Sequence, residues 1–172
     1  MPDKENSPNL VWVAHALSID HKPDNPEERE RIEISGGRVS SMQERDPVTG
    51  VQYPVGPARV YLRFENYPGL AMSRSMGDTI AHSVGVSSEP EIYKHDIIYE
   101  DKFIIIASDG IWEFISSEEA VRTVVPFWHQ NNPNAACEAL QKKAVSIWTS
   151  EETIIDDITC IVIFLNRPNY LV

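Results

Sequence analysis

Two β-branched runs, each bordered by an aspartate, constrain the fold of this chain more than any other feature. Asp109 follows the run at 103–107 (Phe-Ile-Ile-Ile-Ala) after one serine, and Asp156 comes just before the run at 158–165. Such runs are typical of buried strands. If the two strands are antiparallel neighbours, the end of the first lies beside the start of the second. We therefore expect the two carboxylates to meet at one sheet edge, where they would suit a hard divalent cation.

Two helices are predicted between these strands. Ser116 and Glu119 have the spacing of a capping box, and Asn132-Pro133 is a second helix start. The second helix carries an apolar stripe at helical spacing, formed by Ala136, Leu140, Ala144 and Ile147. The order strand, helix, helix, strand predicts a mixed α and β fold with helices packed on a sheet.

The first half of the chain gives weaker signals. Residues 10–17 are apolar enough for a strand, and a helix is predicted from Pro26 to the glycine pair at 36–37, with a short strand after it. Residues 46–68 hold four prolines and two glycines, so we predict a loop insertion there, within which 59–64 alternates like a strand. Residues 1–9 are predicted to be disordered.

Length and composition limit the classes of protein. A chain of 172 residues with 42% hydrophobic and 24% charged residues fits one globular domain. The net charge of -11 argues against nucleic acid or an anionic membrane as partner. No apolar stretch is long enough to span a membrane, and the first residues are too polar for a secretory signal. Cys137 and Cys160 are predicted to be free thiols, and the location cytoplasmic or nuclear.

Several segments, in one order along the chain, resemble the PPM family, the metal-dependent (type 2C) protein serine/threonine phosphatases. They are Asp-His-Lys-Pro at 20–23 with 26–39, Gly-Leu-Ala-Met-Ser-Arg-Ser-Met-Gly-Asp at 69–78, Glu-Pro-Glu at 89–91, Ser-Asp-Gly-Ile-Trp-Glu at 108–113 and Asp-Asp-Ile-Thr at 156–159. The resemblance implies an α+β fold, a four-layer α-β-β-α sandwich of antiparallel sheets flanked by helices. Here it would be a single domain over 1–172, incomplete at its N-terminal side.

The resemblance also implies a metal site. Asp109 and Asp156 resemble direct ligands of two Mg²⁺ or Mn²⁺ ions. Asp20 and Glu113 resemble ligands of a weaker third ion, with Glu113 standing where many members have aspartate. Gly110 would let the chain turn sharply.

Arg74 and Asp78 resemble a structural pair near the site. The family's early glutamate and its Asp-Gly-His-Gly-Gly segment, whose aspartate bridges the two ions and whose histidine is the usual general acid, have no counterpart in this sequence.

These observations leave three functions open. The first is the C-terminal part of an enzyme that hydrolyses phosphoserine and phosphothreonine in proteins, with weak or no activity of this chain alone. The second is a degenerate phosphatase-like module that binds phosphoproteins or regulates a partner. The third, a metal-binding protein with no phosphatase ancestry, is disfavoured by the ordered motifs. Strands missing from a sheet would leave open edges that promote aggregation or dimerisation.

Overall fold

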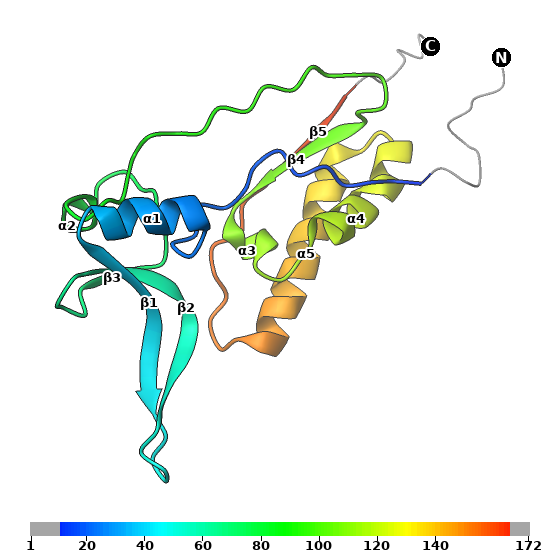
Figure 1. Cartoon of the computed structure of the whole chain (residues 1–172). Helices are drawn as coiled ribbons and strands as arrows, with labels where there is room; N and C mark the ends of the chain where they lie inside the picture. The colour runs from blue at the N-terminus through cyan, green and yellow to red at the C-terminus, as the bar shows by residue number, and fades with distance from the viewer. Residues whose placement is uncertain (1–10, 166–172) are drawn as a thin grey trace. The chain divides into compact units, whose positions relative to one another are not determined.

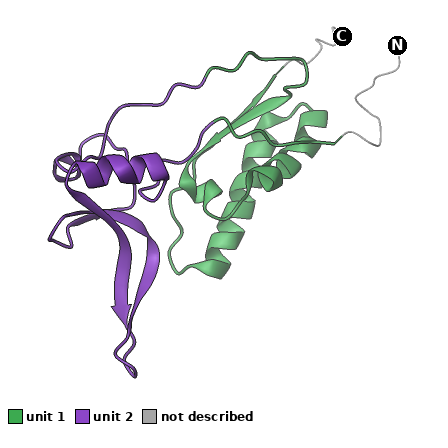
Figure 2. Cartoon of the chain, in the orientation of Figure 1, with its two compact units in different colours: residues 1–17, 94–172 green, residues 18–93 purple. Residues whose placement is uncertain are grey.

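The computed structural model describes residues 11–165, which form two compact units. The central unit is residues 18–93, purple in Figure 2. The flanking unit, green in Figure 2, comprises the described residues before and after it in sequence, 11–17 and 94–165. The predicted single domain over 1–172 stays a prediction, and the predicted disorder of residues 1–9 lies outside the described residues.

A three-stranded antiparallel sheet and a helix make up most of the central unit. Helix α1 (Pro26–Ile34) is followed by β1 (Gly37–Arg45), β2 (Gln52–Leu62), β3 (Pro68–Leu70) and the short α2 (Thr79–His82), with strand order β1-β2-β3. The predicted helix from Pro26 and the strand after the glycine pair are confirmed. The core of this unit consists of buried aliphatic side chains: Ile32, Val39, Val60, Ala81, Val84 and Val86.

The loop insertion predicted at 46–68 is wrong over residues 52–58, whereas the strand predicted within it at 59–64 is confirmed as far as Leu62. Residues 52–62 are strand β2, which pairs with β1 along a long ladder from Gly37↔Leu62 to Arg45↔Gln52. The prolines misled the prediction because a proline cannot donate to a ladder. They are tolerated here because β3 pairs only with Val60 and Tyr61. On the edge of β2 that faces away from β1, Pro54 and Pro57 therefore have no partner in β3.

The flanking unit contains a two-stranded antiparallel sheet, and three helices come between the two strands in the sequence (Figure 1). Its elements are β4 (Phe103–Ala107), α3 (Asp109–Trp112), α4 (Ser117–His129), α5 (Pro133–Glu151) and β5 (Cys160–Phe164). The predicted caps are confirmed, because Ser116 Oγ accepts from Glu119 N at 3.3 Å and Asn132 Oδ1 from Ala135 N at 3.1 Å. The predicted stripe of α5 is also confirmed, with three of its four residues fully buried.

One face of the β4–β5 sheet packs against the helices and the other does not. Val162 is buried with Ile111, Val124 and Leu140, and Ile105 packs against the same core. The alternate residues form the cross-strand pairs Ile104↔Ile163 and Ile106↔Ile161. The side chains of Ile106 and Ile161 are 55% and 53% exposed. This face is apolar and lies outside the core.

The strand predicted at 10–17 is wrong for the described residues 11–17, which belong to no ladder. Their side chains still alternate as in a strand, since Val11 and Val13 are 81% and 78% exposed while Trp12 stacks on Phe103 at 5.7 Å between ring centroids. The sequence pattern therefore reflects which side chains are covered. It does not establish a strand, because a strand also requires a hydrogen-bonding neighbour.

The α+β class and the antiparallel pairing of strands are confirmed. The four-layer arrangement depends on how the two units pack and stays a prediction. Among the described residues, no helix is long and apolar enough to cross a membrane.

Candidate functional site

Antiparallel pairing of β4 and β5 brings together the two aspartate-bearing turns. The register Ala107↔Cys160 places the end of β4 beside the start of β5. Immediately beyond that pair, Ser108 N donates to Thr159 O at 2.9 Å. The segment that carries Asp109 therefore runs beside the segment that carries Asp156, as the sequence predicted.

Ser108 joins the two turns through its side chain as well as its backbone. Its hydroxyl donates to Asp157 O at 3.0 Å and accepts from Thr159 N at 3.1 Å. A single serine thus satisfies both a backbone acceptor and a backbone donor of the opposite segment. This explains a serine in front of Asp109 without any nucleophilic role.

Gly110 allows the closest contact between the turns. The residue is buried, and a Cβ built on it would press into the carbonyl oxygen of Asp157 and come within 3.0 Å of Ile158 Cγ1. Only glycine fits such a close approach of two backbones. The predicted role of Gly110 was to permit a sharp turn, and the structure adds that its missing side chain lets the two backbone segments touch.

The carboxylates themselves lie on the surface. Asp109 is the first residue of α3, Asp156 precedes β5, and both are exposed. Asp156 Oδ1 accepts from the backbone N of Asp157 at 2.7 Å. Glu113 is also exposed, and its backbone N binds Asp109 O at 2.8 Å, so the two acids are one helical turn apart on the same side of α3.

The carboxylates of these residues are ligands of the chemical type that suits a hard divalent cation. Exposed carboxylate oxygens are the ligands that Mg²⁺ and Mn²⁺ prefer. Within the part of the chain that is described, no group of three or more His, Cys, Asp or Glu side chains is gathered closely enough to hold a metal ion. The roles of Asp109, Asp156 and Glu113 as metal ligands therefore stay a prediction.

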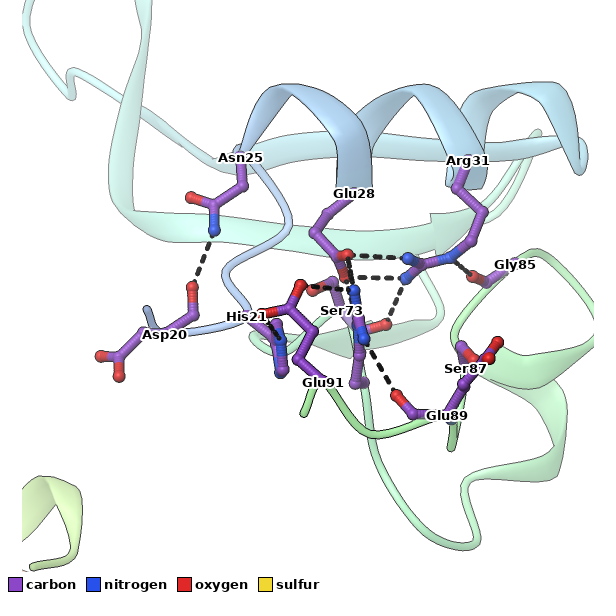
Figure 3. Close-up of polar contacts among 11 residues, drawn as sticks. Asp20, His21, Asn25, Glu28, Arg31, Ser73, Gly85, Ser87, Glu89 and Glu91 are labelled. Atoms are coloured by element: carbon purple, nitrogen blue, oxygen red, sulfur yellow. Dashed lines mark hydrogen bonds and ion pairs between the residues drawn. The ribbon is translucent and has the colours of Figure 1, made fainter. Parts of the chain in front are cut away.

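Asp20 belongs to the central unit. Its backbone carbonyl accepts from Asn25 Nδ2 at 2.7 Å and Lys22 N at 2.9 Å, which fixes the turn that leads into α1 (Figure 3). Its carboxylate is on an exposed residue. The role of Asp20 as a ligand of a third ion stays a prediction.

Arg74 is paired with Glu28 rather than with Asp78, so that predicted pair is wrong. Among the described residues, its guanidinium binds Glu28 Oε1 at 2.7 Å and Glu91 Oε1 at 3.0 Å. Asp78 is instead the exposed residue before α2, with φ 41°. The arginine therefore ties α1 to the 89–91 segment and has a structural role within the central unit.

Glu28 is the centre of this ion-pair cluster (Figure 3). Its side chain is 5% exposed and accepts two hydrogen bonds from Arg31, each at 2.8 Å, besides those from Arg74. The bonds from Arg31, and then those from Arg74, hold the pKa of the Glu28 carboxyl well below its ordinary value of 4.5, although burial acts in the opposite direction. Arg31 also donates to Gly85 O and Ser73 O, both at 2.8 Å.

The two cysteines are free thiols, as predicted. Cys137 lies on α5 and Cys160 on β5, with Cys160 Sγ 3.8 Å from Cys137 O. Burial, and then the neighbouring Cys137, raise the pKa of the Cys160 thiol to about 11. A thiol with so high a pKa is a poor nucleophile at neutral pH.

One residue of the site, Trp148, was missed as a polar partner by sequence reasoning. Its indole Nε1 donates to Gly110 O at 2.8 Å, although Trp148 lies 38 residues further along the chain. Nothing in the local sequence indicates this bond. The helical stripe signals only that Trp148 follows the buried positions of α5.

Comparisons with known proteins agree on one family. The sequence model of the family described as Protein phosphatase 2C matches residues 5–153, which include Asp109 and end shortly before Asp156. Probable protein phosphatase 2C 12 of Oryza sativa subsp. japonica is 36% identical over 152 residues, covering 87% of this chain and 36% of that protein. Probable protein phosphatase 2C 72 of Arabidopsis thaliana is 36% identical over 154 residues, covering 88% and 43%.

Solved structures show the same fold. The crystal structure of serine-threonine phosphatase 2C from Toxoplasma gondii aligns with a TM-score of 0.66 and 24% identity, over 86% of this chain and 46% of that one. A C. elegans sex determining protein aligns with a TM-score of 0.62 and 20% identity, over 87% and 32%. This chain spans less than half the length of the relatives described here. Because the family model matches well over half of it, the chain belongs to the protein phosphatase 2C family.

Proposed function

We propose that this chain supplies the C-terminal part of the active site of a protein serine/threonine phosphatase that depends on Mg²⁺ or Mn²⁺. Its substrates would be phosphoserine and phosphothreonine in proteins. The observation that carries the proposal is the contact between the Asp109 turn and the segment after Asp156, in a chain of this family.

Asp109 and Asp156 would hold the ions, one on each side of a pair, and Glu113 would serve a third ion. Such ions lower the pKa of a bound water and neutralise the charge that develops in phosphoryl transfer. The chain's own contribution is to fix the ligands. Ser108 and Gly110 hold the two turns together through contacts with the backbone of the opposite segment.

For residues 1–172 alone we expect weak Mn²⁺ binding and little or no hydrolysis of p-nitrophenyl phosphate. Two cations without a bridging carboxylate repel each other, so the pair should not assemble. Mn²⁺ should still broaden the NMR amide signals of Ser108, Gly110 and Thr159, and Asp109→Asn should remove that broadening. Glu138→Gln is a matched control, because this exposed acid lies on α5 and pairs with Lys142.

Three outcomes would contradict this proposal. Robust metal-dependent turnover by the isolated chain would show that no bridging aspartate is needed. Absence of Mn²⁺ broadening at these amides in the unaltered chain would remove the metal site itself. Equal broadening in Asp109→Asn would place the ion elsewhere.

The degenerate module is the second candidate, and the observation that favours it is that no three His, Cys, Asp or Glu side chains of the described residues are gathered closely enough to hold a metal ion. It would bind phosphoproteins or regulate a partner without turnover. Sequencing the transcript upstream of the Met1 codon separates the two candidates. An in-frame Asp-Gly-His-Gly-Gly supports the enzyme, whereas an upstream stop codon supports the module.

We also expect self-association of the isolated chain through the β4–β5 sheet. Each strand has an open edge within the described sheet, and the face with Ile106 and Ile161 is exposed. The double substitution Ile106→Thr with Ile161→Thr should lower the sedimentation coefficient measured at high concentration. Ile34→Thr, at a still more exposed position on α1, is the control. A monomeric unaltered chain at all concentrations would contradict this expectation.

A further inference from the structure

Trp148 contacts the Asp109 turn from helix α5. The residue is half-buried on α5, and its indole N–H binds Gly110 O at 2.8 Å. The ring meets Phe114 edge-on, with centroids 4.8 Å apart and planes at 80°. The indole is thus held by an aromatic neighbour on the chain just after α3, and its polar atom points at the residue next to Asp109.

The carbonyl that it binds belongs to a helix of one turn. The last carbonyls of any helix lack backbone donors, and in α3 every residue is close to an end. Asp109 O accepts from Glu113 N at 2.8 Å, and Ile111 O accepts from Ile115 N at 3.1 Å. Gly110 O, between them, accepts from the indole. The tryptophan therefore supplies a donor that fixes a short helix at its buried glycine.

The backbone of Trp148 lies in the last turn of α5, from which the chain continues towards Asp156. Its carbonyl accepts from Glu152 N at 2.9 Å, just beyond the last residue of α5, Glu151, which lies five residues before Asp156. The side chain thus holds the turn of Asp109, while the carbonyl of the same residue holds the start of the loop that leads to Asp156. No other contact described above links both segments to α5.

We propose that Trp148 is a positioning residue for the metal ligands: by binding Gly110 O it holds Asp109 in place against the segment that carries Asp156. This inference rests on the proposed function, because it presumes that the two aspartates bind a common set of ions. A residue that orients ligands without touching the metal typically changes metal affinity by about 10-fold or more when it is replaced.

The test compares Trp148→Phe with Trp12→Phe in the chain of residues 1–172. The first variant keeps an aromatic ring beside Phe114 but loses the N–H donor. The second removes an indole from the same unit, where Trp12 stacks on Phe103 at the other end of β4. Mn²⁺ and Mg²⁺ titrations followed by the amide signals of Ser108, Gly110 and Thr159 give an apparent Kd for each variant. Urea unfolding gives their stabilities.

We expect Trp148→Phe to raise the apparent Kd about 10-fold and Trp12→Phe to leave it unchanged, even where the two lose similar stability. An unchanged Kd in Trp148→Phe would overturn the positioning role and leave the proposed function intact. An equal rise in both variants would also overturn it, because loss of stability would then explain the effect. If the unaltered chain shows no metal response at these amides, the proposed function fails and this inference fails with it.

Discussion

Replacing Glu28 by alanine is expected to lower the free energy of unfolding of the central unit by about 3 to 5 kcal/mol. The Glu28 side chain is 5% exposed, and Arg31 and Arg74 both bind it. Removing one partner of a buried ion pair leaves the other charges without compensation, and here two guanidiniums lose their shared carboxylate. The unit should be close to unfolded, because such a loss is comparable to the whole stability of a small domain.

Glu33→Ala is the matched control for this substitution. Glu33 lies on the same helix and forms a salt bridge with Arg29, but both side chains are about half exposed. We expect an effect within about 1 kcal/mol. All four tryptophans lie in the flanking unit, so unfolding of the central unit should be followed by the NMR methyl signals of Val39, Val60 and Val84. Equal effects of the two substitutions would show that the Glu28 cluster is not a structural centre.

Acid should weaken the central unit for the same reason. The folded-state pKa of Glu28 lies below its unfolded value, so its contribution is complete above about pH 5 and is lost as the pH falls below 4.5. Urea titrations at pH 7 and pH 3 should show a larger loss in the unaltered chain than in any Glu28→Ala protein that still folds. A pH-independent stability of the unaltered central unit between these values would contradict this.

The arrangement of the candidate site followed from local patterns. Two β-branched runs that border aspartates allowed one simple pairing, and the capped helices between them set the length of the connection. That pairing is observed, with Ala107 opposite Cys160. Such patterns predict a fold correctly when the sequence of each element shows which of its residues are buried and when few topologies can connect the elements.

The predictions that failed depended on contacts with other segments of the chain, which the local sequence does not indicate. The prolines of β2 suggested a loop, because their tolerance depends on which edge of the strand is paired. Arg74 was assigned to Asp78, four residues away, but it binds Glu28 from 46 residues away. Trp148 gave no sign that it binds Gly110. Side-chain partners of large sequence separation are fixed by tertiary packing, which a single sequence does not display.

Replacing Gly110 by alanine is expected to lower the free energy of unfolding of the flanking unit by about 3 kcal/mol. The new methyl group would have to occupy the space of the Asp157 carbonyl oxygen and would lie 3.0 Å from the Asp157 carbonyl carbon. Backbone atoms cannot move aside as the end of a flexible side chain can. The turn must therefore shift, which strains the bonds of Ser108 to Asp157 and Thr159 and that of Trp148 to Gly110.

Asp109→Ala, studied in buffer without metal ions, is the control for Gly110→Ala. Asp109 is exposed, and its replacement should change the stability by about 0.5 kcal/mol or less. Urea unfolding followed by tryptophan fluorescence reports on the flanking unit alone, because it contains all four tryptophans. With Mn²⁺ the two variants should both fail to bind the ion, for different reasons: one lacks the ligand, and the other holds it in the wrong place. A stable Gly110→Ala chain that binds Mn²⁺ normally would mean that the contact between the two turns does not position Asp109.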